Sequence, residues 1–149
     1  MATTAASCLP AAATVVIQAL KADAALVAAL GQDIIETLPP ENAAPPYVIV
    51  LTGRERPNNT LGGTFGSGGF GRIGTLNVIV VSRYLGTKEV DLLASRIMQV
   101  LDNTEHDLDP AGYPGNGRLT WLETDELTVE TVNNEVYFER RLLFEMTVA

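Results

Sequence analysis

The pattern of apolar positions is strongest between residues 72 and 101, where it predicts a strand followed at once by a helix. Residues 72–84 are expected to form a central strand, because apolar side chains occupy both of its faces. These side chains are Leu76, Val78 and Val80 on one face, and Ile79 and Val81 on the other. Gly86 and Thr87 then begin a helix, with Thr87 as its N-cap. Its apolar stripe, which we expect to lie on a sheet, consists of Val90, Leu93, Ala94, Ile97 and Leu101.

Two shorter helices are predicted near the N-terminus. Pro10 suits the first turn of a helix. The apolar stripe after it consists of Val15, Val16, Ala19 and Leu20. Asp23 is expected to cap a second helix at 24–30, and Gly31 to end it.

Two extended segments follow these helices. Residues 33–38 are expected to form an edge strand that ends at Pro39 and Pro40, which lack the N–H group that a sheet requires. The apolar run at 47–52 is of strand type, and we expect it to neighbour the central strand.

The C-terminal region predicts a hairpin, with strands at 118–132 and 135–148 joined by Asn133-Asn134. A two-residue turn there places Val132 opposite Glu135, Val129 opposite Phe138, and Glu126 opposite Arg141. The apolar face of the last strand, interrupted by Arg140 and expected to cover the core, consists of Val136, Phe138, Leu142, Phe144, Met146 and Val148.

Acidic residues break the apolar face of the first hairpin strand. Glu123 and Asp125 share the parity of Leu119, Trp121, Leu127 and Val129. Either a bulge or a local pairing with Arg140 would accommodate them, and the sequence leaves both open. A catalytic carboxylate pair is the less favoured interpretation.

A long glycine-rich loop is predicted at 54–71. Gly66, Gly68 and Gly71 satisfy G-x-G-x-x-G, but a dinucleotide site requires a strand before the loop and a helix after it, and here a strand follows. The loop is interpreted either as plainly flexible or as a segment that becomes ordered on a partner, with Phe65 and Phe70 as anchors. The residues assigned to partner binding are Arg54, Arg56, Leu61, Phe65, Phe70 and Arg72.

A second loop is predicted at 102–117. It contains His106, the only histidine, beside Glu105, Asp107 and Asp109. These residues lack the glycine and the distal carboxylate of a calcium loop, and zinc would require more nitrogen or sulfur ligands. We therefore expect a solvated acidic loop without a metal.

Together these elements predict an α/β fold of the α+β type. A mostly antiparallel sheet is expected to pack against the central amphipathic helix, with a short helical region at the N-terminus. Residues 1–149 are expected to form one domain. The centre of its core is predicted to contain Leu93, Ile97, Val80 and Phe144.

Composition and charge reduce the number of function classes that fit this chain. Hydrophobic residues make up 46% of the chain and charged residues 19%, which suggests that neighbouring subunits cover apolar surface. The net charge of −8 argues against binding to nucleic acid through its phosphates, although an acidic surface could line a channel through which DNA slides. No apolar run approaches the length of a membrane span, and residues 1–13 lack the basic residues of a signal or transit peptide.

Reactive residues are few. Cys8 is the only cysteine, has no thiol or histidine near it in sequence, and is expected to be inert. We find no spaced set of acid, base and nucleophile, so we expect no catalytic residue, no cofactor and no enzymatic activity.

The order of segments resembles a known family. The segments that carry the resemblance are L-K-A-D-A-A-L near residue 20, P-P-Y-V-I-V at 45–50, V-I-V-V-S-R at 78–83 and L-L-A-S-R-I-M-Q-V-L at 92–101, before the terminal hairpin. In this order the chain resembles the small tail-completion or tail-terminator proteins of long-tailed, non-contractile bacteriophages. The loop at 57–71 is longer and richer in glycine than expected for that family.

The resemblance implies a structural virion protein without enzymatic activity. It implies a homo-oligomeric ring of six copies on the last ring of the major tail tube protein, at the head-proximal end of the tail. There the ring would stop tube growth and meet a head–tail connector protein, while DNA passes through its lumen without specific binding. Assembly in the host cytoplasm, without a membrane, would follow. A head–tail connector (neck) protein and a minor tail protein are the alternatives.

Overall fold

The computed structural model describes residues 6–38, 43–57, 71–83 and 87–148. The elements of the first half are the helices α1 (Leu9–Lys21) and α2 (Ala24–Leu30), and the strands β1 (Ile35–Glu36), β2 (Tyr47–Pro57) and β3 (Arg72–Ser82). Those of the second half are the helix α4 (Lys88–Leu101), strand β4 (Thr104–Asp107), the 3-10 helix η2 (Asp109–Ala111), and strands β5 (Asn116–Thr124), β6 (Thr128–Val132) and β7 (Glu135–Val148).

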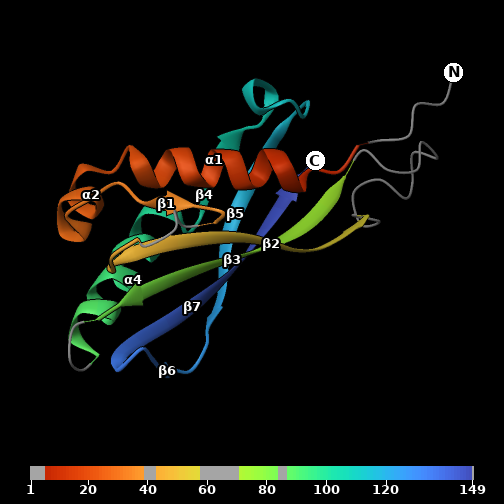
Figure 1. Cartoon of the computed structure of the whole chain (residues 1–149). Helices are drawn as coiled ribbons and strands as arrows, with labels where there is room; N and C mark the ends of the chain where they lie inside the picture. Colours follow the sequence, from red (N-terminus) through yellow and green to blue (C-terminus); the bar gives the residue numbers. More distant parts are fainter. Residues whose placement is uncertain (1–5, 39–42, 58–70, 84–86, 149) are drawn as a thin grey trace, which may run out of the picture.

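The strands form one curled sheet (Figure 1) with the order β1-β2-β3-β7-β5-β4, and β6 pairs with the first part of β7. All neighbours are antiparallel except β1 and β2. The predicted fold class, an α+β fold with a mostly antiparallel sheet, is therefore confirmed. In Figure 1 the far ends of β2 and β7 lie at one end of the molecule, and α2, the start of α4 and the β6–β7 turn lie at the other.

The helices pack on one face of this sheet. The apolar stripe predicted for α4 is buried as expected, and the four residues predicted for the centre of the core are at most 2% exposed. The core cluster contains Val78 and Val80 of β3, but not Ile79 and Val81, which are also buried and point to the opposite face. We call the face with the helices the core face and the opposite one the helix-free face.

Helix ends follow the predicted signals closely. Asp23 caps α2 by accepting a hydrogen bond from the Leu26 amide at 3.0 Å, and Gly31 ends that helix with a left-handed φ of 73°. Thr87 is the N-cap position of α4, but its side chain makes no capping hydrogen bond.

A helix that crosses a bilayer must be long and apolar. No single helix among the described residues is long and apolar enough to do so, and α1 and α2 reach that length only as a pair bent by 80°.

The strand pairing predicted for the terminal hairpin is confirmed near its turn but is wrong further along. Val132 pairs with Glu135 and Val129 with Phe138, as predicted. The expected strand at 118–132 is divided into β5 and β6, and Glu126 is not opposite Arg141. Instead the chain leaves the ladder after Thr124, and the amide of Asp125 donates to the Arg141 carbonyl at 2.8 Å.

Of the two accommodations considered for the acidic residues, the bulge is present, whereas Arg140 pairs with neither the Glu123 nor the Asp125 carboxylate. The register of β5 against β7 shifts between Trp121 and Glu123, which is the bulge. Arg140 donates instead to the Asp125 carbonyl at 3.2 Å, and to the carboxylate of Asp91 on α4 at 2.8 Å. The extra residue of the bulge thus changes which side chains of β5 face the core, and no carboxylate has to be buried there.

The predicted loops are wrong in extent. Residues 104–107 form the edge strand β4 because they pair with 116–119, and Leu108 and Tyr113 are buried within the supposed loop. The expected loop at 54–71 loses 54–57 to β2, since these residues continue the ladder with β3. The expected strand at 33–38 is only the two-residue β1.

Replacing Ile97 by Ala is expected to lower the free energy of unfolding by about 2 to 4 kcal/mol, because the side chain is fully buried and the cavity left behind would collapse only in part. Chemical denaturation measures this loss. The exposed Ser95→Ala change on the same helix is the control, and a loss below about 0.5 kcal/mol for Ile97→Ala would contradict the packing of α4.

Asp23→Ala is expected to lower stability by about 1 to 2 kcal/mol, because it removes a helix cap. It also removes the ion pair to Arg96 on α4, with nitrogen–oxygen distances of 2.6 and 2.8 Å. Asp23→Asn keeps a capping oxygen and should lose less.

The hydrogen bond from Arg96 lowers the pKa of Asp23. Because the folded-state pKa is the lower one, the charged contribution is present above the unfolded pKa of about 3.9 and is lost as the pH falls through the folded value. Equal stability of the wild type and Asp23→Asn at pH 7 would contradict a role for the ion pair.

Candidate functional site

The residues predicted to bind a partner are only partly described by the structure. Arg54 and Arg56 lie on β2 and Arg72 on β3, so all three belong to strands rather than to a loop. Pro57 pairs with Arg72, which brings the three arginines to one end of the β2–β3 ladder. We call 53–57 together with 72–74 the hairpin end. Leu61, Phe65, Phe70 and two glycines of the G-x-G-x-x-G sequence, Gly66 and Gly68, lie outside the described residues.

A bulge in β2 shapes the hairpin end. The register shifts between Thr52 and Glu55, and the Thr75 hydroxyl accepts a hydrogen bond from the Arg54 amide at 2.7 Å. A side chain at Gly53 would collide with that hydroxyl, so glycine is required at the bulge. After the bulge, Glu55 points to the core face and Arg56 to the helix-free face.

Glu55 holds the start of α1 at the hairpin end. Its carboxylate accepts a hydrogen bond from the Cys8 amide at 2.7 Å. Burial opposes ionisation of Glu55, but hydrogen bonds from Cys8 and Ser7 and the charge of Arg72 together outweigh it, so the pKa of Glu55 is lowered. Burial, together with this carboxylate, raises the pKa of the Cys8 thiol to about 12. The thiol is therefore neutral at physiological pH, in agreement with the expected inert cysteine.

Two of the three arginines are available to a partner. Arg54 and Arg56 are exposed, and neither guanidinium has a hydrogen bond or an ion pair with a described residue. Arg72 is half-buried and donates to the Gly71 carbonyl at 3.1 Å. The chain as a whole carries a net charge of −8. At the hairpin end, however, these two exposed cations favour a negatively charged partner.

The helix-free face carries an apolar strip across β2, β3 and β7. Ile49 pairs with Ile79, and Asn77 pairs with both Leu51 and Leu143. Opposed residues of antiparallel strands share a face, so these side chains form one surface. The members of the strip are Tyr47, Ile49, Leu51, Ile79, Val81 and Leu143, of which Leu51 is 40% exposed whereas Ile79 and Val81 are buried. The exposed Arg141 pairs with Ile79 on the same face.

Carboxylates border this strip at the end opposite the arginines. Glu139 pairs with Val81, and Glu130 pairs with Tyr137 on the same face. Burial and the charge of Glu139 both raise the pKa of Tyr47. Sequence reasoning missed this arrangement, because the alternation of charged residues within one strand does not reveal which strands are neighbours.

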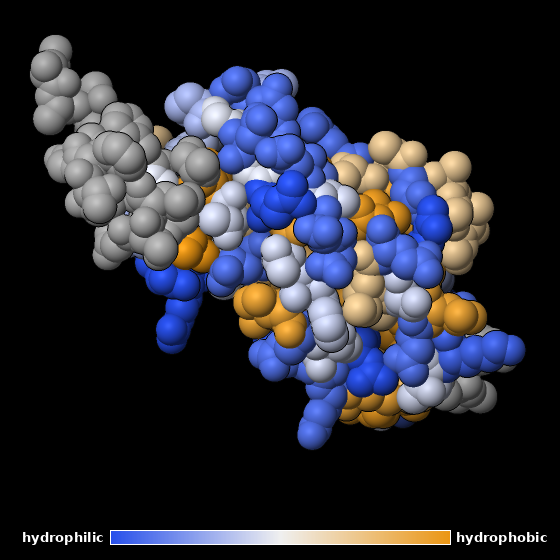
Figure 2. All heavy atoms as spheres, turned by 180° about the vertical axis from the view of Figure 1, so that it is seen from behind, coloured by the Kyte–Doolittle hydropathy of each residue, from blue (hydrophilic) through white to orange (hydrophobic). Residues whose placement is uncertain are grey.

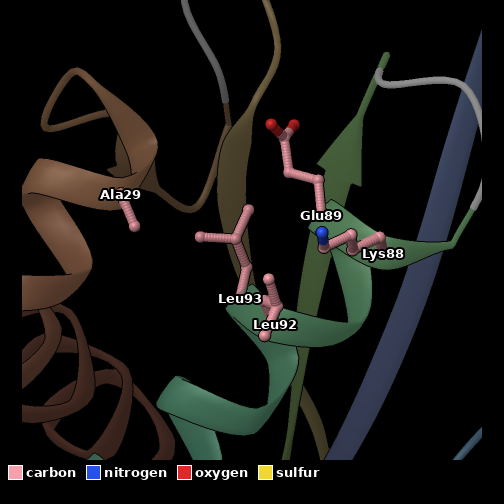
Figure 3. Close-up of a pocket in the computed structure, with 5 residues that line it drawn as sticks. All are labelled: Ala29, Lys88, Glu89, Leu92 and Leu93. Atoms are coloured by element: carbon pink, nitrogen blue, oxygen red, sulfur yellow. The ribbon is translucent and has the colours of Figure 1, made fainter.

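A pocket of about 280 Å³ lies between α2 and α4. Figure 3 shows Ala29 of α2 facing Leu92 and Leu93 of α4, with Lys88 and Glu89 at the first turn of α4. Glu89 accepts a hydrogen bond from the Ser82 hydroxyl at 2.6 Å, and Leu92 is 62% exposed. Hydrophobic colours are visible over this helical end of the molecule, at the right of Figure 2. The lining suits an apolar side chain rather than a reaction.

The acidic segment around His106 uses its polar groups internally. His106 contacts the Thr104 hydroxyl at 2.8 Å, and burial lowers the pKa of the imidazole. Asp107 and Asp109 accept backbone hydrogen bonds within the turn, at 3.0 and 2.9 Å. Within the described ranges, no group of three or more His, Cys, Asp or Glu residues could hold a metal ion.

A family model and a solved structure match this chain over most of its length. A family model described as "Tail completion protein gp17" matches residues 14–145. Among solved structures, the fold is similar to a chain of the "Virion of native gene transfer agent (GTA) particle", with a TM-score of 0.64 and 23% sequence identity over 89% of this chain and 90% of that chain. At this identity the likeness concerns the fold alone. No curated protein sequence matches the chain.

Cys8 is expected to react with an aromatic disulfide reagent at pH 8 at least about tenfold more slowly than a free thiol, because the thiol is buried and its pKa is about 12. The absorbance of the released thiolate measures the rate. Full reactivity should return in denaturant, which serves as the control. Rapid reaction of the folded protein would contradict the contact between α1 and the hairpin end.

Proposed function

The chain belongs to the tail completion protein gp17 family, and on this premise we propose that it forms a closed ring that caps the end of the phage tail tube. The family predicted from the order of segments is thereby confirmed. Membership makes the protein a structural component of a virion tail that assembles with other tail and head proteins. The proposal adds that the ring stops polymerisation of the tube and forms the tail side of the head–tail junction.

The match of the family model to residues 14–145 is the observation that carries this proposal. The physical argument starts from the tube itself. A tube subunit presents the same surface to each newcomer, so growth continues until something binds that surface and fails to reproduce it. A cap must therefore match the tube on one side and differ on the other.

The asymmetry of the sheet supports such a role. One face is covered by helices, the other bears an apolar strip, and the exposed cations Arg54 and Arg56 lie at one end. We assign these two arginines to partner binding, and with them the other predicted residues, Leu61, Phe65, Phe70 and Arg72. The partners proposed are further copies in a ring of six, the major tail tube protein and a head–tail connector protein at the head-proximal end.

The proposed role requires no enzymatic activity. The described pocket is apolar, and its carboxylate, Glu89, is engaged by Ser82. DNA would pass through the lumen of the ring, and a net charge of −8 per chain disfavours adhesion of its phosphates there.

Phage lacking this protein are expected to produce headless tails of abnormal, uncontrolled length, because nothing stops addition of tube subunits. Negative-stain electron microscopy of the lysate gives the length distribution. Supplying the wild-type protein from a plasmid is the control and should restore tails of one length joined to heads. Tails of normal length that merely fail to join heads would instead assign the protein to the connectors or minor tail proteins.

A further inference from the structure

We propose that Glu55 is a positioning residue for partner binding, because its contact with the start of α1 sets where Arg54 and Arg56 meet the partner. We call the hydrogen bond between the Glu55 carboxylate and the Cys8 amide the Glu55 contact. The inference rests on the partner-binding role proposed for the two arginines, and it adds the residue that controls their position.

The hairpin end needs a second attachment because β2 is an edge strand there. β1 ends its pairing with β2 at Ile49, so among the described residues 53–57 are paired with a strand on one side alone, that of β3. They also follow the bulge, where the ladder with β3 is interrupted. A bulge bends its strand, and an edge strand lacks backbone hydrogen bonds on its outer side. The ladder by itself therefore fixes the two arginines poorly.

The start of α1 supplies the second attachment on the core face. The bulge directs Glu55 toward α1, where its carboxylate accepts from the Cys8 amide at 2.7 Å. At Gly74, opposite in the ladder, an added Cβ would come within 2.8 Å of Leu9 and 3.5 Å of the Cys8 sulfur. The first residues of α1 thus lie directly on the hairpin end, and Figure 1 shows the start of this helix beside the start of β3.

The Glu55 contact depends on charge. The carboxylate interacts electrostatically with Cys8 at the start of α1, with Arg72 of β3 and with Tyr113 after η2. In acid only the carboxylate changes its charge, because arginine stays protonated and the thiol and the phenol stay neutral. Burial opposes ionisation of Glu55, yet its hydrogen bonds and the charge of Arg72 keep its pKa below the usual value. The contact is therefore complete above the unfolded pKa of about 4.3 and is lost as the pH falls through the folded value.

A charge effect and a positioning effect have opposite signs at this site. Removing the Glu55 charge makes the hairpin end more positive, so a negatively charged partner would bind more tightly if charge alone mattered. If Glu55 positions the two arginines, the same change weakens binding, because the arginines must then be ordered when the partner binds.

Amide hydrogen exchange measures the Glu55 contact directly. The Cys8 amide, and the Arg54 amide that donates to Thr75, should exchange at least about tenfold faster in Glu55→Ala than in the wild type. In the wild type, after correction for intrinsic rates, the same acceleration should appear as the pH falls below about 4. Glu55→Gln, which keeps an acceptor oxygen without the charge, should lose this pH dependence. Amides of α4 around Ile97 should be unchanged.

The yield of infectious phage measures the consequence for binding. Each chain is supplied from a plasmid to phage lacking this protein. Glu55→Ala and Arg54→Gln/Arg56→Gln should each restore at least about tenfold fewer infectious particles than the wild type. In the chain that lacks both arginines, Glu55→Ala should cause no further loss, because Glu55 acts through them.

The matched control is Glu123→Ala, which removes an exposed carboxylate that also lies at a bulge, in β5. It should exchange at the hairpin end and restore phage as the wild type does. Thermal unfolding of each chain confirms that it is folded, and the result in the chain without the arginines separates positioning from a general loss of stability.

Four results would overturn the inference. The first two are unchanged exchange of the Cys8 and Arg54 amides in Glu55→Ala, and restoration of phage by that chain as well as or better than by the wild type. The third is an equal further loss when the arginines are absent, and the fourth is full restoration by Arg54→Gln/Arg56→Gln. None of these bears on capping. Tails of normal length in phage lacking the protein would remove the capping role but leave the comparison of infectivity valid.

Discussion

The pairing of β3 with β7 is the interaction on which the rest of the structure depends. Every residue from Arg72 to Ser82 is opposed by a residue of β7, which places the last strand of the chain in the middle of the sheet. On one side β3 continues to β2 and β1, and on the other β7 continues to β5 and β4. The two halves of the chain thus form one sheet only because their central strands meet.

This register also decides what each face can do. A shift of one residue would move Leu142 and Phe144 from the helices to solvent, and would place Arg141 and Glu145 in the core. The core face is therefore strongly specified by burial. On the helix-free face the same register brings apolar residues of three strands together and places Arg141 beside Ile79.

Carboxylates, in addition to apolar contacts, hold the N-terminal helices in place. Glu55 accepts from the Cys8 amide at the start of α1, and Asp23 joins the cap of α2 to Arg96 of α4. Each carboxylate satisfies a helix N-terminus and also joins elements that are distant in sequence. Elements joined in this way would suit the proposed docking on a tail tube.

Much of the fold could be predicted because its signals are local. The stripe of α4, the cap and the terminating glycine of α2, and the Asn133-Asn134 turn depend on spacing and on backbone preferences within a few residues. The family resemblance also followed from the order of such segments, and the family model supports it. Of the predicted partner residues, however, the structure describes only Arg54, Arg56 and Arg72, and it assigns them to strands.

The sequence by itself therefore determined the main helices, the apolar strands, the hairpin turn and the family. Only the tertiary structure decided that 104–107 is an edge strand, that β5 and β6 are separate, and that Arg56 and Glu139 share a face. The physical reason is that a polar strand is stabilised by hydrogen bonds to a partner distant in sequence, and that a face is defined by register between strands. Neither leaves a periodic signal within a single segment.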